Sequence, residues 1–378
     1  MNKPYHIVIT TIFHPLILDE LFDNISKHDH LDETKIWIVG DKKTPGSVGE
    51  FAKRISSKGL ETIYVDVATQ EEWGKEYTDF YRCFPYNTQS RRGVGFPWVL
   101  QDGCEILILI DDDNFPTGDD FIGGHANTGK IWNGQMISEP VGFHNVCEYL
   151  EFEPSRHVFT RGFPFHLRDT RNNPVRKTEK PVRIGATAGL WLSAPDVDAT
   201  TWLNGRISGV KYKGEPTNVL HQDTWAPINT QNTSILRELI PAFVPVPMGW
   251  DVPGGKIDWY NDIWGGYFFQ ALTQGMPYNV AFGRPLVDHR RNPHEYINDL
   301  RQEFWGIILT DWLVNLLKAD FRPISLNILD RLGELADFLE EKTDMSMPAW
   351  TPAEMKSFMK NISGTMRQWS KVCEKIMK

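Results

Sequence analysis

Three consecutive carboxylates, Asp111 to Asp113, directly follow the apolar run Ile106–Ile110. A continuous Ile/Leu run without alternation is typical of a strand buried on both faces of a parallel sheet. In open α/β sheets, ligands bind at the carboxyl ends of such strands. Three adjacent carboxylates repel one another, and a hard divalent cation such as Mg²⁺ or Mn²⁺, itself held against a diphosphate, is the simplest way to neutralise them. The alternative is a solvated acidic turn without a ligand.

Several common nucleotide-binding and catalytic motifs are missing from the sequence. Gly249, Gly254, Gly255 and Lys256 have the wrong spacing for a P-loop, and Ile257 stands where a Ser or Thr would hold Mg²⁺. The first predicted strand is not followed by GxGxxG, which argues against a Rossmann NAD or flavin site. A GxSxG nucleophile elbow is also absent. The acidic strand end is therefore the main chemical signal.

Alternating strands and helices precede the carboxylates. We predict strands at 6–12, 35–41, 61–66 and 106–110, with helices at 15–26 and 47–57. This order indicates a parallel, doubly wound sheet with right-handed crossovers. Residues 69–98 are polar, aromatic and without a clear period, so we expect them to be irregular.

The rest of the chain changes character twice. Residues 115–230 are rich in Pro, Gly, Asn and Trp, and we interpret their basic residues as a solvated loop: Arg168, Arg171, Arg176, Lys177, Lys180 and Arg183. Prolines exclude a regular helix from 241–253. Helices are predicted at 262–274, 295–319, 323–342 and 352–377. We expect an α/β catalytic domain at 1–294 and a helical region at 295–378, whose apolar helix packs on the main domain or on a dimer partner.

Composition restricts the class of protein. The 378 residues carry 40 basic and 49 acidic side chains, a net charge of −9, which argues against a general nucleic-acid binder. The four cysteines are scattered without a CxxC pair, so neither a disulfide framework nor a zinc site is expected. The sequence shows no signal peptide and no window of 18 apolar residues. We therefore expect a cytoplasmic protein without a transmembrane segment.

Further motifs, in their order along the chain, resemble one protein family. Ile110–Phe115 is similar to a family segment with three Asp residues followed by Cys-Phe, and Phe159–Arg168 is similar to Phe-Val-Arg-Gly-Tyr-Pro-Phe-Ser-Leu-Arg. Other matches are Gly189–Leu192, Pro195, Asp196, Asn232, Arg237–Ile240, Tyr260–Gly266, His289 and Asn292 with Pro293. The chain thus resembles the reversibly glycosylated polypeptides, the UDP-arabinopyranose mutase family, and similar GT-A-type glycosyltransferases. The resemblance implies a GT-A-like (Rossmann-like) α/β fold, with a mixed, mostly parallel sheet flanked by helices and a C-terminal helical extension.

The resemblance also implies which residues form the site. The implied metal ligands, for Mn²⁺ or Mg²⁺, are Asp111, Asp112, Asp113 and His289. The implied contacts to the nucleotide sugar are Thr10, Thr11, Asp41, Arg91, Arg92, Asp111, Asp112 and Trp191. For His289, Asp41 and the arginine pair, the competing interpretations are a polar loop residue, a turn residue and a solvated pair. Most tryptophans in a chain with 14 of them are packing residues.

Two further residues are implied to be catalytic. Arg161 matches the arginine associated with reversible glycosylation in the family. A guanidinium is always protonated and therefore a poor nucleophile, so an ion pair or a diphosphate clamp is the alternative role. Asp262 is implied as a general base or as a stabiliser of an oxocarbenium-like state, and its alternative is to open a helix. Asn261 departs from the family's Asp at that position.

These observations predict a metal-dependent UDP-sugar enzyme, either a mutase that interconverts pyranose and furanose rings or a self-glycosylating protein. One alternative is a GT-A glycosyltransferase acting on an external glycan acceptor. A second alternative is a non-catalytic partner or scaffold. We also expect a homo-oligomer.

Overall fold

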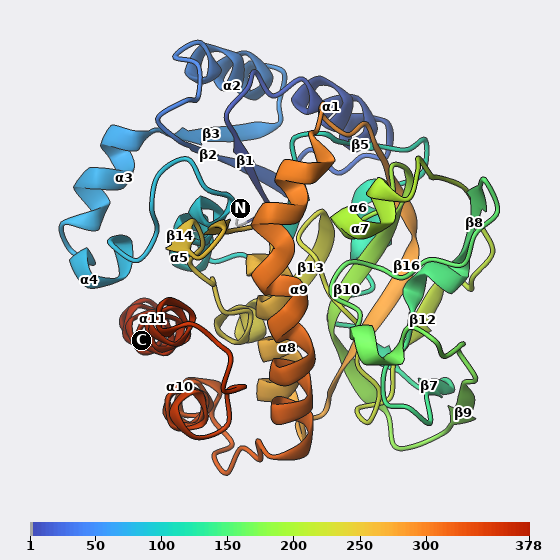
Figure 1. The fold of residues 1–378 in the computed structure, drawn as a ribbon. Coiled ribbons are helices and arrows are strands. Elements are labelled where there is room, and N and C mark those ends of the chain that lie inside the picture. The colour runs from blue at the N-terminus through green and yellow to red at the C-terminus, as the bar shows by residue number, and fades with distance from the viewer. Residues whose placement is uncertain (1–2) are drawn as a thin grey trace.

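A mixed twelve-stranded sheet forms the centre of the molecule (Figure 1). The computed structural model describes residues 3–378. Along its main path the strand order is β12-β16-β10-β13-β4-β1-β2-β3. Its strands are β1 (Tyr5–Thr11), β2 (Thr34–Gly40), β3 (Glu61–Val65), β4 (Ile106–Asp111), β5 (Asn114–Pro116), β6 (Ile131–Trp132), β8 (Leu150–Glu153), β10 (Val182–Ser193), β11 (Ser208–Tyr212), β12 (Thr217–Val219), β13 (Asn232–Leu236) and β16 (Tyr278–His289). Two small sheets pair β7 (Met136–Ser138) with β9 (Val175–Lys177) and β14 (Trp250–Val252) with β15 (Gly255–Ile257).

Helices flank this sheet and extend beyond it at the C-terminus. They are α1 (Ile17–Lys27), α2 (Val48–Ser57), α3 (Val67–Gly74), α4 (Thr78–Tyr81), α5 (Gly95–Asp102), α6 (Phe121–His125), α7 (Ala199–Leu203), α8 (Asn261–Thr273), α9 (Tyr296–Ala319), α10 (Ile328–Met345) and α11 (Ala353–Met377), with short 3₁₀ turns at Gln89–Val94, Val146–Tyr149, Phe165–Leu167 and Arg237–Ala242. The predicted mixed sheet, its flanking helices and the C-terminal helical extension are confirmed.

The N-terminal half of the sheet is parallel, as predicted. β4, β1, β2 and β3 run side by side in the same direction. Ile106 to Ile110 is buried on both faces, which explains its unbroken apolar sequence. Because parallel strands end at one edge, Thr10, Asp41 and Asp111 come together there although they are distant in sequence.

Residues 69–98 are more regular than predicted. α3, α4, a 3₁₀ turn and α5 occupy most of this segment. The Asp66 side chain caps α3 by accepting the Thr69 N–H, and Gly103 ends α5 in the left-handed conformation with φ of 86°. Phe80 and Phe96 are buried against Trp369 of α11. Tertiary packing therefore determines these short helices, and a local sequence period does not reveal it.

The other half of the sheet is largely antiparallel and places the last part of the site. β13 runs antiparallel to β4, whereas β10 and β16 pair in parallel. The short strand β5 lies antiparallel to the end of β16, with Asn114 opposite His289. This pairing brings His289 to the three carboxylates that link β4 and β5.

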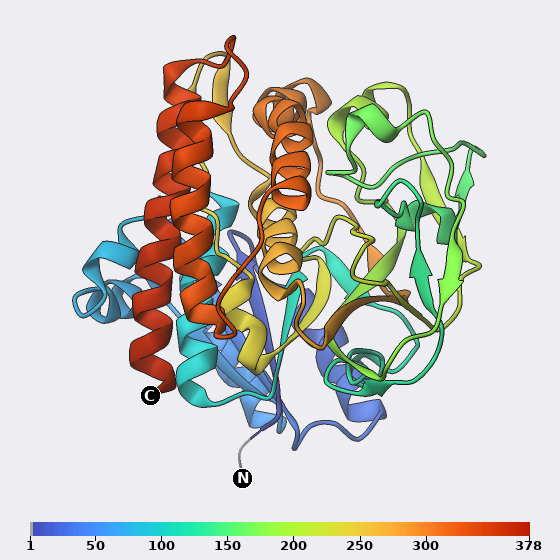
Figure 2. The same ribbon diagram turned by 90° about the horizontal axis from the view of Figure 1, so that it is seen from below.

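The three C-terminal helices pack mainly against other helices and against the small β14–β15 sheet. α10 and α11 lie side by side (Figure 2). α10 begins five residues later than predicted because Asn327 caps it, accepting the Leu329 N–H. The main hydrophobic cluster contains residues of both the sheet and these helices, and a domain boundary at 294 stays a prediction. In the described part of the chain, none of the helices has the length and apolar character needed to cross a membrane.

Candidate functional site

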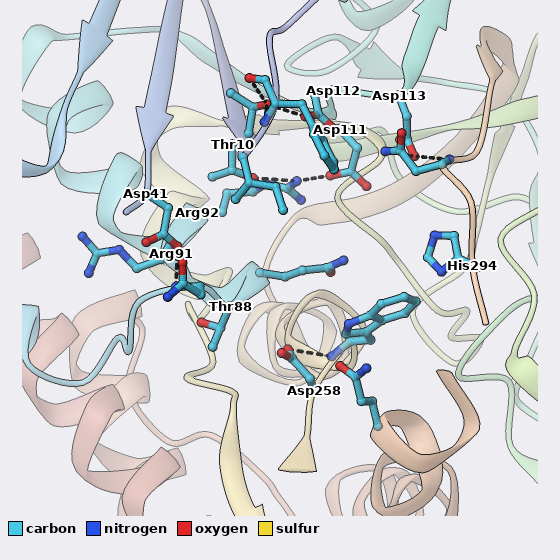
Figure 3. Close-up of a pocket in the computed structure, with 18 of the residues that line it drawn as sticks. Thr10, Asp41, Thr88, Arg91, Arg92, Asp111, Asp112, Asp113, Asp258 and His294 are labelled. Carbon is cyan, nitrogen blue, oxygen red and sulfur yellow. Dashed lines mark hydrogen bonds and ion pairs between the residues drawn. The ribbon is translucent and has the colours of Figure 1, made fainter. Parts of the chain in front are cut away.

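A cavity of about 440 Å³ opens at the carboxyl ends of β1, β2 and β4 (Figure 3). That volume lies within the range of small-molecule sites. Predicted residues in its lining are Thr10, Thr11, Asp41, Arg91, Arg92, Asp111, Asp112 and Asp113. The structure thus brings together most of the nucleotide-side residues.

The three carboxylates point to three different sets of partners. Asp111 forms an ion pair with Arg92, which is itself nearly buried. Asp112 accepts a hydrogen bond from the Thr11 hydroxyl. Asp113 faces His289, with 3.4 Å between Oδ2 and Nε2. The carboxylates therefore surround a space instead of converging on one point.

This arrangement leaves the strand end with excess negative charge. Burial is the main cause that raises the pKa of Asp112, to about 7, and burial also raises the pKa of Asp111 despite the nearby Arg92 guanidinium. Burial alone would raise the pKa of Asp113, but the hydrogen bond and charge of His289 lower it. One guanidinium does not neutralise three carboxylates, so an added cation would be stabilised here.

Asp113 and His289 form the part of the predicted metal set that fits a metal ion. Within residues 3–378, no group of three or more His, Cys, Asp or Glu side chains is arranged to hold a metal alone. His289 Nδ1 lies 2.7 Å from the Ala194 carbonyl oxygen, an acceptor that fixes the proton on Nδ1. In the neutral ring, the Nε2 lone pair then faces the Asp113 carboxylate. A proton on Nε2 or a metal ion would turn the repulsion between the lone pair and the carboxylate into attraction, so Asp113 and His289 are the residues that would hold a metal here.

Two of the predicted nucleotide-side residues, Arg91 and Asp41, also have partners within the protein. Arg91 is only 1% exposed, and its guanidinium donates to the Phe84 carbonyl, Gln70 and Tyr81, so it holds its own segment in place. Asp41 accepts the backbone N–H groups of Lys42 and Asn87, both at 2.6 Å. Asp41 thereby fixes the wall of the cavity and keeps its remaining acceptor capacity for a ligand.

A smaller cavity of about 70 Å³ lies beyond the carboxylates and ends at Arg161. Arg161 is 6% exposed and uses all five of its N–H groups: Nε and Nη2 donate to Asp196, Nη1 donates to the Trp259 carbonyl, and both Nη atoms donate to Asp262. Burial opposes protonation, but the charges of Asp196 and Asp262 outweigh it and raise the pKa of Arg161. The guanidinium is a permanent cation in this wall.

The glycine after Arg161 explains how the arginine reaches this position. Gly162 has φ of +82°, and a Cβ at this residue would lie 2.2 Å from Cγ2 of Ile263. Only glycine fits such a left-handed residue pressed against α8. The Arg161 N–H also donates to the Asp196 carbonyl oxygen at 2.9 Å. The backbone and the side chain of Arg161 are therefore both fixed against Asp196.

Two predicted site residues do not line either cavity. Asp262 lies behind Arg161, and its carboxylate is occupied by the guanidinium and by the N–H groups of Thr230 and Ile263. Trp191 is 1% exposed and belongs to the core, so it cannot stack on a sugar in this structure. Among the predicted site residues, Arg161 lines a cavity, whereas Trp191 does not.

Several cavity residues were not identified as site residues from the sequence. Asp196 and Glu303 line the smaller cavity, and Asp258 lines the larger one. Burial raises the pKa of Glu303 to about 8 and that of Asp258 to about 6. His294 lines both cavities. The Pro195-Asp196 match was a signal for Asp196, whereas the other three depend on how α9 and its preceding loop pack.

The amino-acid sequence is similar to one protein family and to several of its members. Residues 50–376 match the family model described as reversibly glycosylated polypeptide. A probable UDP-arabinopyranose mutase 1 from Pisum sativum is 25% identical over 287 residues, which cover 72% of this chain and 70% of that protein. UDP-arabinopyranose mutase 3 from Arabidopsis thaliana is 26% identical, with 69% and 64% covered. The chain therefore spans about two thirds of the length of these relatives.

Among solved structures, glucosyl-3-phosphoglycerate synthase from Mycobacterium tuberculosis, in complex with Mn²⁺, UDP and phosphoglyceric acid, is 11% identical with a TM-score of 0.41. The match covers 82% of this chain and 78% of that one.

Proposed function

The chain belongs to the reversibly glycosylated polypeptide family, and from that premise we propose that it is a metal-dependent enzyme that interconverts the pyranose and furanose forms of a UDP-sugar. The observation that carries the proposal is the cluster Asp111–Asp113, whose excess negative charge faces a cavity of nucleotide size next to His289. The names of the mutases that it resembles support the same reaction.

The residues of the larger cavity have proposed roles in binding the nucleotide. Asp41 accepts hydrogen bonds from the base or ribose, and Thr10 and Thr11 add polar contacts at the end of β1. Asp113 and His289 would hold Mn²⁺ or Mg²⁺, with Asp111 and Asp112 as flanking carboxylates. When bound, the metal stabilises the charge that develops on the departing diphosphate.

The sugar is proposed to occupy the smaller cavity, between Asp113 and Arg161. Arg161 supplies a fixed positive charge, and Asp196 and Asp262 hold it in place. We propose this electrostatic role for Arg161 instead of the role of a nucleophile. A protonated guanidinium that donates all five of its N–H groups has no lone pair with which to attack the sugar. Asp262 is accordingly a positioning residue for Arg161 and not the base.

Incubation with UDP-arabinopyranose and Mn²⁺ tests the proposal. We expect a UDP-furanose product, separable from the pyranose by chromatography, and loss of the conversion when EDTA removes the metal. Binding of UDP in the presence of metal, measured by calorimetry, distinguishes an enzyme from a scaffold. A protein that binds neither UDP nor a UDP-sugar with metal would contradict the proposal and favour the scaffold.

A second candidate function is sugar transfer to an external glycan acceptor. An open groove of about 620 Å³ continues from the smaller cavity past His289, Arg291 and Trp202 to the outer surface. A mutase needs no such route, so the groove favours an acceptor. Radiolabelled UDP-sugar with and without a glycan mixture decides between them: label on the glycan supports transfer, and label on the protein that cold UDP-sugar chases off supports self-glycosylation.

A further inference from the structure

His294 lies where three spaces meet. It lines the larger cavity, the smaller cavity and the outer groove, while its side chain is 18% exposed. Figure 3 shows the ring in the open space below Asp113. Any sugar held between the carboxylates and Arg161 would therefore pass next to this ring.

One nitrogen of His294 is fixed by a buried carboxylate. Nδ1 lies 3.0 and 3.2 Å from the two oxygens of Asp299, which is 2% exposed and also accepts from Arg291 at 3.1 Å. An ionised carboxylate only accepts hydrogen bonds, so Nδ1 carries the proton in the neutral ring. Within residues 3–378, no hydrogen bond or ion pair occupies Nε2, and the residue that carries this nitrogen lines both cavities and the groove.

This arrangement is that of a histidine base oriented by an acid. Asp299 lies in the first turn of α9 and forms an ion pair with Arg291, so the dyad is anchored to this helix. Trp259 packs edge-on against the ring at 5.0 Å between centroids, which restricts its rotation. Asp262, which the sequence predicted as the general base, lies behind Arg161 and lines neither cavity. Another residue must therefore act as the general base.

We propose that His294, oriented by Asp299, is the catalytic acid–base that moves one proton between two sugar oxygens during ring contraction; this rests on the proposed mutase function. His294 Nε2 takes the proton from O4 while O4 bonds to C1. The C1–O bond to the diphosphate breaks, and its electron pair stays on the diphosphate. The imidazolium then returns the proton to O5 as the C1–O5 bond breaks, and a diphosphate oxygen bonds again to C1. One proton leaves O4 and one reaches O5, so the step needs no oxidant, reductant or other reactant.

The test compares His294→Gln with His166→Gln. His166 also pairs with an acid of α9, Asp311, at 3.1 Å, but lies outside the cavities. We expect His294→Gln to lower kcat for furanose formation by about 10²- to 10⁴-fold, the range of general acid–base catalysis. UDP affinity with Mn²⁺ should stay within about threefold, because a group used only in the transition state changes kcat and not ligand binding. His166→Gln should match the wild type in both measurements.

Rescue by a small molecule separates proton transfer from structural support. Added imidazole should restore furanose formation at least about tenfold in His294→Ala, because it supplies the missing base, and should not restore Asp113→Asn. Thermal unfolding of each variant checks that it is folded. A folded His294→Gln that forms furanose at the wild-type rate would overturn the assignment, as would a loss that matches a loss of UDP affinity. Wild-type protein that fails to bind UDP with metal would instead contradict the proposed function itself.

Discussion

Two groups of carboxylates contribute to the lining of the smaller cavity, one through Asp111 and Asp113 and the other through Asp196, and the two groups are neutralised in different ways. At the strand end, Asp111 pairs with the buried Arg92 guanidinium, Asp113 pairs with the His289 imidazole, and Asp112 accepts a hydrogen bond from the Thr11 hydroxyl. At the other wall, Asp196 and Asp262 enclose Arg161, whose N–H groups are all engaged. The hydrogen bonds of the Arg161 guanidinium are all made within the protein, so we call Arg161, Asp196 and Asp262 the complete group. The strand-end carboxylates, which we call the open group, keep negative charge with which to bind a ligand. The comparison indicates that one wall is built for stability and geometry and the other for binding.

The largest expected effect follows from breaking the complete group. Arg161→Ala should lower the free energy of unfolding by about 3–5 kcal/mol, because it leaves two buried carboxylates without their cation. Arg183→Ala is the control, since Arg183 pairs with Glu238 at the surface and should cost about 1 kcal/mol or less. Urea denaturation measures both. Equal, small losses would show that the Arg161 group is not the structural wall described here.

Removing a carboxylate from the open group should act on ligand binding. Asp113→Asn is expected to weaken metal-dependent UDP binding by at least about 10- to 100-fold, a loss that even outer partners of metal sites can cause. Calorimetry with UDP and Mn²⁺ measures it, and Asp119→Asn, an exposed neighbour paired with Arg284, is the control. Unchanged affinity in Asp113→Asn would remove the distinction between the two groups.

Glu303 lines the smaller cavity together with Arg161 and Asp196, and its charge depends on pH. Burial raises the pKa of Glu303 from 4.5 to about 8, so the folded protein keeps a proton there that the unfolded chain has lost. Stability should therefore fall as pH rises from about 4.5 to about 8, by at most about 1.4 kcal/mol per pH unit. Glu303→Gln, which cannot ionise, should flatten this fall in urea denaturation series. A wild-type curve with the same slope as the variant would contradict the buried acid.

The smallest effect separates two tryptophans by their place relative to the cavities. Trp259 lines both cavities, and Trp259→Phe should weaken UDP-sugar affinity by about three- to tenfold, the size of an aromatic contact. Trp191→Phe should leave the affinity within about twofold, because Trp191 lies in the core. Fluorescence titration compares them. A larger loss in Trp191→Phe would show that the core position reaches the ligand after all.

The sequence predicted the acidic strand end because its signal is local. An unbroken run from Ile106 to Ile110 has few alternatives to a buried strand, and the carboxylates follow from its end. Residues 69–98 lacked such a signal, since their helices depend on packing against α11. The positions of Asp262 and Trp191 could not be predicted either, because a residue's type does not reveal whether another side chain lies between it and the cavity.

His294 is a cavity residue that the sequence did not reveal. The proposed role of His294 depends on its contact with Asp299 and on its position where the two cavities and the groove meet. Both depend on how the loop after β16 packs against α9. A lone histidine in a polar loop carries no such information in the sequence. The cytoplasmic location and the homo-oligomer stay predictions.

The pairing of β5 with β16 sets an order of events during synthesis. Asp113 leaves the ribosome early, whereas Asn292, which donates to its carboxylate, follows 179 residues later. At usual rates of translation, roughly 10 to 40 s separate the two. During that interval the nascent chain carries its acidic turn without His289 and without α9. A growing polypeptide therefore lacks the complete site until the segment that carries His289, Asn292 and α9 has been made.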